Sequence, residues 1–293
     1  MSRRWFAPAK LNLYLHVTGR RADGYHLLDS LVAFASIGDE LRVEPAERLS
    51  LAVEGPFASS LDGTPNQNLV WRAAEMLAEE AGHAPRVRLT LTKNLPVASG
   101  IGGGSSDAAA CLRALGAMWE LPDREPLDRV AAKLGSDVPA CLAARGAWLG
   151  GVGEAIEPAG SLPECGLVLV NPGVPLRTPS VYRGFGGKFS STSRFEVPDT
   201  AADLAVLLAA RENDLTDAAI RLVPAIGEVL ARLGGLDGAL LARMSGSGAT
   251  CFALFATEAE AQAAAATLAN EKRSWWIEAG KLRRDDAPLS LEP

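Results

Sequence analysis

The segment LPVASGIGGGSSDAAACL, residues 95–112, constrains the fold of this chain more than any other part of the sequence. It places four glycines and two serines in positions 100–106 and then continues into alanines, which favour a helix. Glycines let the backbone reach positive φ and let its N–H groups approach a ligand closely. Because a helix begins with unpaired N–H groups and a positive dipole end, we predict a strand-to-helix loop that binds phosphate.

The common phosphate-binding and nucleophile motifs do not describe this loop. No lysine follows its last glycine, so it is not a P-loop, and Ser105 stands where the dinucleotide fingerprint requires a third glycine. The GxSxG pattern of α/β-hydrolases is absent from the chain. A tight turn with Ser105 or Ser106 as the helix N-cap is the structural alternative, but it needs only one such residue.

The composition indicates a globular protein of one large or two smaller domains. The chain has 293 residues, is 48% apolar and carries a net charge of −6, which argues against a general nucleic-acid binder or a basic membrane-surface protein. Its four cysteines form no CxxC pair, and its three histidines have no metal-ligand spacing. No apolar run approaches the roughly 20 residues that span a bilayer, and no signal-peptide core follows the N-terminus. We therefore expect a soluble protein of the reducing cytoplasm.

Strand and helix patterns interleave, and several strand pairs resemble hairpins, which favours an α+β fold over a parallel sheet. Gly150–Gly153 marks the expected boundary between domains 1–150 and 151–293. Residues 175–193 are expected to form a long surface loop, and residues 283–293 a loose or edge-strand tail. The expected strands cover 10–17, 86–95, 165–173 and 250–256, with one or two more in 41–53, where Pro45 interrupts the pattern. The expected helices cover 69–81, 105–119, 126–134, 201–210 and 213–233, with one more opened by residues 135–139 and a last one from Glu258.

Three segments together resemble one enzyme family. The segment LPVASGIGGGSSDAAA resembles the second motif of the small-molecule kinases named after galactokinase, homoserine kinase, mevalonate kinase and phosphomevalonate kinase, the GHMP kinases. PAKLNLYL resembles their first motif and MSGSGATCFALF their third, in the family's order and across most of the chain. The resemblance implies an N-terminal ATP-binding α+β domain, a ferredoxin-like C-terminal α+β domain and an active site in the cleft between them.

A narrower resemblance concerns the acceptor of the phosphate. The phrases PAKLNLYLHVTGRRADGYHLLDSL, GSDVPACL and RTPSVY are similar to those of family members that phosphorylate a cytidine diphosphate-linked sugar alcohol. This implies ATP and Mg²⁺ as cofactors, and transfer to the 2-hydroxyl of the acceptor on the non-mevalonate route to isoprenoid precursors. It leaves a monomer or a homodimer open and implies neither nucleic acid nor membrane as a partner.

The resemblance assigns the chemistry to two charged residues. Asp137 would be the general base that takes the proton from the attacking hydroxyl, and Lys10 would keep that carboxylate ionised and stabilise the transferring group. From the residues alone, Asp137 before Pro139 is a helix N-cap, and Lys10 on a strand lies on a solvated face. Both interpretations of Asp137 are compatible, because a helix N-terminus also favours the ionised carboxylate.

The remaining site residues are divided between the nucleotide and the acceptor. Tyr25 and Tyr182 are expected to sandwich the cytosine, with His26 at its edge, although taken alone they would be packing residues. Asn68 read alone is a helix N-cap, and Lys93 a solvated strand end. The ATP residues that the resemblance implies are Asn68, Lys93, Pro96, Val97, Ala98, Ser99, Gly100, Ile101, Gly102, Gly103, Gly104, Ser105 and Ser106, and the acceptor residues are Asn12, Tyr25, His26 and Tyr182.

Three other functions stay open at the level of the sequence. The chain could be a kinase of the same family for mevalonate, homoserine or a sugar, but those small acceptors need no aromatic clamp. It could be a nucleotide-binding module without catalysis, which Lys10 and Asp137 argue against, or a structural domain with a glycine-rich turn.

Overall fold

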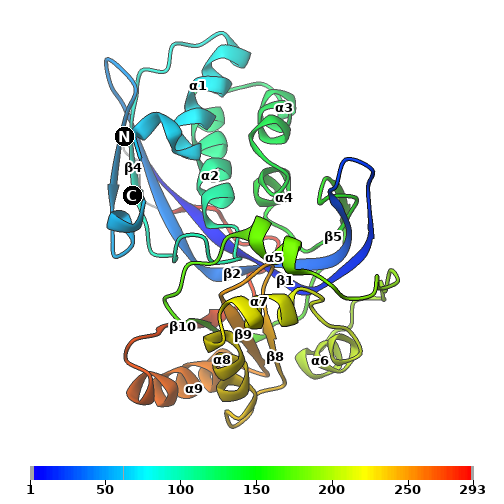
Figure 1. Cartoon of the computed structure of the whole chain (residues 1–293). Coiled ribbons are helices and arrows are strands. Elements are labelled where there is room, and N and C mark those ends of the chain that lie inside the picture. Colours follow the sequence, from blue (N-terminus) through cyan, green and yellow to red (C-terminus); the bar gives the residue numbers. More distant parts are fainter. Residues whose placement is uncertain (1–2, 62, 292–293) are drawn as a thin grey trace.

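The computed structural model describes residues 3–61 and 63–291. Two β-sheets lie against each other, and helices cover the outer face of each (Figure 1). Among the described residues the larger sheet has seven strands in the order β11-β1-β2-β4-β3, with β5 and β6 continuing from β2, and the smaller has the order β10-β7-β9-β8. This is the α+β arrangement that the sequence predicts.

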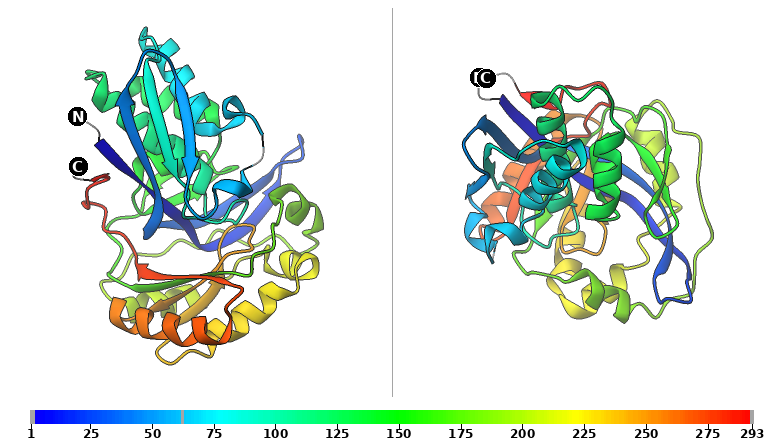
Figure 2. Two further views of the ribbon diagram at one scale, coloured as in Figure 1. Left: turned by 90° about the vertical axis from the view of Figure 1, so that its left-hand side faces the viewer. Right: turned by 90° about the horizontal axis from the view of Figure 1, so that it is seen from above.

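Strands β1 (Arg3–Arg20) and β2 (His26–Pro45) form a long antiparallel hairpin that runs between the two halves of the molecule (Figure 2). The turn at residues 21–24 ends with Gly24 at a φ of 93°, a conformation that glycine adopts readily. The centre of β1 is buried on both faces, because one face meets the helices and the other meets the smaller sheet. The solvated face expected for Lys10 is therefore wrong, since only 4% of that residue is exposed.

The other strands are short and complete the two sheets. The C-terminal tail pairs with β1 as an edge strand, so both described ends of the chain lie side by side (Figure 2); residues 292 and 293 of that predicted tail lie outside the described residues. The remaining strands of the larger sheet are β3 (Ser50–Glu54), β4 (Val87–Thr92), β5 (Ala147–Gly150), β6 (Ala155–Pro158) and β11 (Ser290–Leu291). Those of the smaller sheet are β7 (Gly166–Asn171), β8 (Leu241–Met244), β9 (Cys251–Phe255) and β10 (Trp276–Lys281).

Within residues 3–61 and 63–291, four helices cover the outer face of the larger sheet. The first begins at Asn68, whose side chain accepts a hydrogen bond from the Val70 N–H at 2.9 Å, and ends at Gly82 in the left-handed conformation. The second follows the glycine loop and packs its alanines closely against β1 and β2. These helices are α1 (Leu69–Ala81), α2 (Gly103–Met118), α3 (Glu125–Leu134) and α4 (Val138–Ala143), and two 3₁₀ turns, η1 (Ala58–Ser60) and η2 (Pro65–Gln67), precede them.

Five helices belong to the C-terminal half of the part of the chain that the structure describes. The last of them has a capping box, in which Thr257 and Glu260 exchange side chain-to-backbone hydrogen bonds. Together with α7 and α8 it packs on the outer face of the smaller sheet. These helices are α5 (Thr178–Gly184), α6 (Ala201–Ala209), α7 (Thr216–Leu222), α8 (Ala225–Gly234) and α9 (Glu258–Glu271). No helix among the described residues is long and apolar enough to cross a membrane.

The structure changes two of the predicted elements. Residues 178–184, inside the expected loop 175–193, form α5, because Pro179 occupies the first helical turn. The expected helix 213–233 is divided into α7 and α8, since Pro224 cannot continue the backbone hydrogen-bond ladder of α7. The expected domain boundary at residues 150–153 falls in the turn between β5 and β6 of the larger sheet; the division into 1–150 and 151–293 stays a proposal.

A buried carboxylate fastens the loop that follows α5 to the hairpin. Asp29 on β2 is 1% exposed and accepts hydrogen bonds from the Tyr14 hydroxyl at 2.7 Å and the Ser193 N–H at 2.8 Å. Arg194 approaches the same carboxylate at 3.4 Å. A buried charge needs partners. These contacts therefore hold residues 193–194 against strands β1 and β2.

We expect Tyr14→Phe to lower the free energy of unfolding by about 1–3 kcal/mol, because it leaves a buried carboxylate with one donor fewer. Urea denaturation measures this loss. Tyr25→Phe is the matched control. Tyr25 is 65% exposed, so loss of its hydroxyl should leave the free energy of unfolding unchanged. Equal unfolding midpoints for wild type and Tyr14→Phe would contradict the expectation.

Candidate active site

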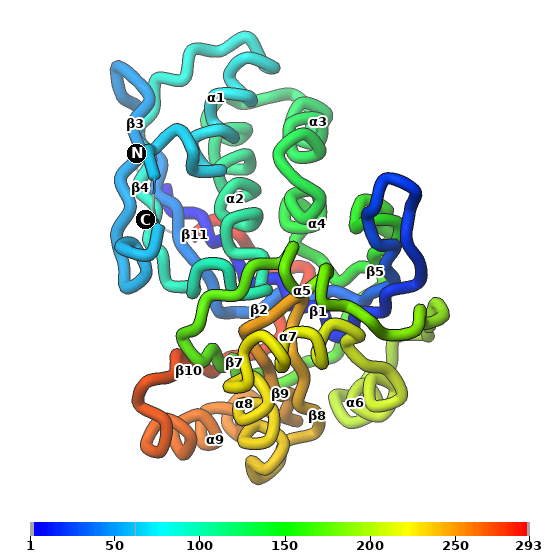
Figure 3. Tube along the Cα trace, in the orientation of Figure 1, coloured from blue at the N-terminus to red at the C-terminus, as the bar shows by residue number. Residues whose placement is uncertain are grey.

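One cleft with a volume of 1230 Å³ lies where the glycine loop, the β1–β2 hairpin, the two residues before α4 and helix α5 meet. Figure 3 shows these segments converging at the centre of the molecule, although they are far apart in the sequence. Residues 246 and 247 of the third motif also reach the cleft. The three sequence motifs therefore line a single cleft.

The glycine loop is held in shape by the third motif. Gly100 has a φ of 77°, and a Cβ there would lie 2.6 Å from the carbonyl oxygen of Ser245, so no larger residue fits. The Ser245 hydroxyl donates to the Gly100 carbonyl at 3.1 Å, and the Thr250 N–H donates to the Ser99 carbonyl at 3.0 Å. Helix α2 begins directly after Gly102, so its unpaired first-turn N–H groups are presented at the cleft.

Lys10 and Asp137 form an ion pair beside this loop. The Lys10 Nζ lies 2.7 Å from Asp137 Oδ1, although the residues are 127 positions apart. The Lys10 N–H also donates to the Ile101 carbonyl at 2.9 Å, and a Cβ on Gly102 would lie 3.1 Å from the Lys10 Cβ. Asp137 precedes α4 but makes no side-chain cap hydrogen bond, so its carboxylate serves the ion pair.

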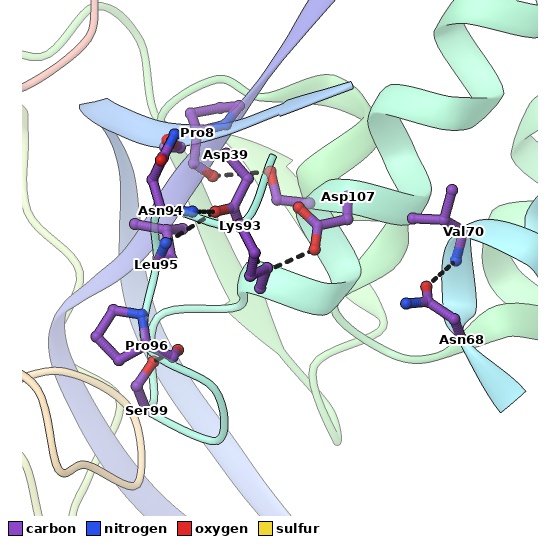
Figure 4. Close-up of polar contacts among 12 residues, drawn as sticks. Pro8, Asp39, Asn68, Val70, Lys93, Asn94, Leu95, Pro96, Ser99 and Asp107 are labelled. Carbon is purple, nitrogen blue, oxygen red and sulfur yellow. Dashed lines mark hydrogen bonds and ion pairs between the residues drawn. The ribbon is translucent and has the colours of Figure 1, made fainter. Parts of the chain in front are cut away.

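Lys93 lies at the other end of the loop between two buried carboxylates (Figure 4). Its ammonium bonds Asp39 and lies 2.7 Å from Asp107 Oδ2, while Asp39 also accepts from the N–H groups of Asn94 and Leu95 at 2.6 and 2.8 Å. Burial alone would lower the pKa of Lys93, but Asp107 and Asp39 hold it above its ordinary value. The predicted solvated strand end is therefore wrong, because only 2% of Lys93 is exposed.

Asp107 supplies an oxygen that could serve a metal ion. Its Oδ1 is buried and has no hydrogen-bond partner among the described residues, and the residue lines the cleft with Ser105. Carboxylate and hydroxyl oxygens are ligands that Mg²⁺ accepts, usually with substrate phosphates completing its shell. Burial raises the pKa of Asp107 well above its ordinary value, while Lys93 opposes this shift. No cluster of three acidic, histidine or cysteine side chains suited to a metal occurs in the described part of the chain.

An aromatic cluster lines the opposite end of the cleft. The His26 ring stacks on Tyr182 with a centroid distance of 5.1 Å and meets Phe185 edge-on at 5.9 Å. Burial, and then the positive charge of Arg20, lower the pKa of His26, so the imidazole is neutral at pH 7. Tyr25 lines the cleft with its ring largely exposed. The structure thus places His26 directly against Tyr182, with Tyr25 on the same wall of the cleft as His26.

Most of the residues predicted from the sequence line this one cleft. Two do not: Ile101 is fully buried in the core, and the Ser106 hydroxyl donates to the Pro8 carbonyl at 2.7 Å. Asn68 is the N-cap of α1, as the local sequence predicts, and it also lines the cleft. The predicted residues that line it are Lys10, Asn12, Tyr25, His26, Asn68, Lys93, Pro96, Val97, Ala98, Ser99, Gly100, Gly102, Gly103, Gly104, Ser105, Asp137 and Tyr182.

Several residues of the site have no sequence signal of their own. Asp39 is one of several acidic residues on its strand, and nothing in the sequence around it indicates that it pairs with Lys93. Phe185 lies three positions after Tyr182, the last residue of RTPSVY, and this proximity is the one sign that could have added it to the aromatic cluster. Arg20 and Arg183 line the cleft at the same end.

Comparison with known proteins gives one consistent family. Residues 68–145 match the family model of the GHMP kinases N terminal domain, and residues 198–273 match that of the GHMP kinases C terminal domain. A 4-diphosphocytidyl-2-C-methyl-D-erythritol kinase from Paramagnetospirillum magneticum is 54% identical over 94% of this chain and 97% of its own. The enzyme of that name from Rhodospirillum rubrum is 52% identical over 96% of this chain and 93% of its own.

Solved structures agree with the sequence relatives. The crystal structure of a 4-(cytidine 5'-diphospho)-2C-methyl-D-erythritol kinase superposes with a TM-score of 0.77 at 39% identity, covering 96% of this chain and 99% of the other. A homoserine kinase from Cytophaga hutchinsonii gives a TM-score of 0.73 at 16% identity, covering 99% and 97%, which shows a shared fold alone.

We expect Asp107→Asn to alter how stability depends on pH. Because the carboxyl has a raised pKa in the folded state, it favours folding below its unfolded pKa of about 4 and loses that contribution as pH rises through the folded pKa. The asparagine variant has no such loss, so its melting temperature should gain on the wild type as the pH rises above about 4. A difference between the two proteins that is constant across this range would show that Asp107 titrates normally.

Proposed function

The chain belongs to the 4-diphosphocytidyl-2-C-methyl-D-erythritol kinases of the GHMP kinase superfamily, and we propose that it transfers the γ-phosphate of ATP to the 2-hydroxyl of 4-diphosphocytidyl-2-C-methyl-D-erythritol. This reaction belongs to the non-mevalonate route to isoprenoid precursors. The observation that carries the proposal is the Lys10–Asp137 pair beside a phosphate-binding loop, in a cleft whose far end is aromatic.

Asp137 is proposed as the general base. Its carboxylate takes the proton of the acceptor hydroxyl while that oxygen forms a bond to the γ-phosphorus, and the bond from the γ-phosphorus to the departing ADP oxygen breaks. The side chain of Asp137 is 40% exposed, so a substrate hydroxyl can reach the oxygen that Lys10 leaves open. A positioned base contributes about 10² to 10⁴ in rate.

Lys10 is proposed to act on both partners of the transfer. Its ammonium pairs with the Asp137 carboxylate and orients it, and its contacts with Ile101 and Gly102 put the positive charge next to the loop that would hold the phosphates. Charge that builds up on the transferring group would be stabilised there, a contribution of about 3 to 4 kcal/mol for one preorganised donor. The low exposure of Lys10 reduces screening by water.

Magnesium is proposed as the companion of ATP. When bound, it would neutralise charge on the phosphate oxygens. Ser105 and Asp107 are the residues that would hold it, because both line the cleft at the start of α2 and Asp107 Oδ1 has no hydrogen-bond partner among the residues that the structure describes. Lys93 keeps the other Asp107 oxygen fixed, so the free oxygen is oriented before the nucleotide arrives.

The aromatic end of the cleft is proposed to take the cytosine. Tyr25 and Tyr182 offer ring faces for stacking, and neutral His26 can exchange hydrogen bonds with the base edge. Asn12 lies two residues after Lys10 on β1 and is 4% exposed. Its side-chain amide donates to the Ser30 hydroxyl, and the residue lines the cleft, where it is proposed to contact the acceptor. A kinase for mevalonate, homoserine or a simple sugar has no use for this aromatic end, which favours the cytidylated acceptor.

The location and assembly of the enzyme stay proposals. Its cysteines Cys111, Cys141, Cys165 and Cys251 are buried free thiols, which supports a cytoplasmic, reducing compartment. Either a monomer or a homodimer is compatible with a cleft formed within one chain.

The direct test incubates the protein with ATP, Mg²⁺ and 4-diphosphocytidyl-2-C-methyl-D-erythritol and identifies the phosphorylated hydroxyl by ³¹P and ¹H NMR. We expect phosphate on the 2-hydroxyl and stoichiometric ADP. Asp137→Asn should lower kcat by about 10² to 10⁴ with little change in KM, because the base acts in the transition state. Phosphorylation of mevalonate or homoserine instead, or full activity of Asp137→Asn, would refute the proposed reaction or the proposed base.

We expect Tyr182→Ala to raise KM for the cytidylated acceptor by about 5- to 100-fold, since stacking of a base on an aromatic side chain contributes about 1–3 kcal/mol. The KM for ATP should not change, because the nucleotide loop is at the other end of the cleft. Steady-state kinetics with each substrate varied in turn measures both. An equal rise in both constants would mean that the variant is misfolded rather than impaired in stacking.

A further inference from the structure

The cations of the cleft differ in whether a carboxylate already neutralises them. Lys10 is paired with Asp137, and Lys93 lies between Asp39 and Asp107. Two other cations line the cleft, Arg20 at the end of β1 and Arg183 in α5, and neither has a carboxylate within 4 Å in residues 3–61 and 63–291. A cleft proposed to hold a triphosphate and a diphosphate thus has, among the described residues, two arginines without an ion-pair partner at one end. Asp23, which also lines this end, is itself paired with Arg21 at 2.6 Å.

That end is the aromatic one. Arg183 follows Tyr182 directly, and Arg20 lies close enough to His26, which stacks on Tyr182, for its charge to help lower the pKa of the imidazole. The glycine loop and the α2 N-terminus, which would bind ATP phosphates, lie next to Lys10 and Lys93 instead. The two arginines are therefore placed for an anion attached to the group on the aromatic rings.

Both guanidinium groups retain free donors. Arg20 uses its Nε to donate to the Gly24 carbonyl at 3.1 Å, which holds it against the hairpin turn. Arg183 makes two long hydrogen bonds of 3.3 Å, to the Pro179 carbonyl and the Ser180 hydroxyl. Because a guanidinium has five N–H donors in a planar fork that matches phosphate oxygens, each arginine has donors left for a ligand.

We propose that Arg20 and Arg183, on the hairpin and on α5, bind the diphosphate of the cytidylated acceptor between them and thereby fix the distance from the cytosine clamp to Asp137. The inference rests on the proposed function, since it presumes an acceptor with this diphosphate. The chain carries a net charge of −6, so an anionic acceptor needs such local cations. Both arginines are positioning residues, because they lie at the end of the cleft away from the reacting hydroxyl.

The test measures binding of CDP and of cytidine to the full-length enzyme by calorimetry, without ATP. We expect wild type to bind CDP more tightly than cytidine. Arg20→Gln and Arg183→Gln should each weaken CDP binding about tenfold and leave cytidine binding unchanged. Raising the salt concentration should weaken CDP binding to wild type more than to the double variant.

Lys188→Gln is the matched control, because it removes an exposed positive charge four residues beyond Gly184 that does not line the cleft. It should bind CDP as wild type does. Unchanged CDP affinity in the double variant, or an equal loss for CDP and cytidine, would overturn the role of the arginines while leaving the proposed reaction intact. Failure of wild type to bind either compound would overturn both proposals.

Discussion

The lysines of the cleft are held by carboxylates, and this pairing determines what the site can do. A buried ammonium is tolerated only when an opposite charge compensates the loss of water, so Lys93 needs Asp39 and Asp107, and Lys10 needs Asp137. The two pairs differ in purpose. Lys93 is enclosed and braces the glycine loop, whereas Asp137 remains open to solvent and keeps one side free for a substrate.

Strand β1 holds Lys10 and Asn12 in buried positions. The glycine loop packs against Lys10 and the Ser245 hydroxyl bonds the backbone of Asn12, while the smaller sheet covers the other face of the strand. The polar side chains of β1 must then find partners or line a cleft, and they do both. The same burial explains why Asp29 and Tyr14 are joined beneath the hairpin, which fixes the strands that carry the site.

The cleft has two chemically different ends that suit two different ligands. Backbone N–H groups from the glycine loop and α2 serve one end. The lysines there are already paired with carboxylates, so phosphate charge would be bound mainly by these N–H groups. Aromatic rings and two arginines that form no ion pair with any described residue serve the other end, where a base and its phosphates would be recognised together. The Lys10–Asp137 pair lies between the ends, so the two ligands would meet at the residues proposed to transfer the phosphate.

The sequence by itself determined the local structure and the family. Glycines at 100 and 102, the cap at Asn68 and the alternation of β1 are local signals, and each is borne out in the backbone. Pairings across long separations were decided only in the tertiary structure: Asp39 with Lys93, Ser245 with Gly100, and the arrival of Arg20 and Arg183 at one end of the cleft. A single sequence shows which side chains can be charged, but partners 54 to 145 residues apart meet only when the sheets close on each other, because burial selects which charges must pair.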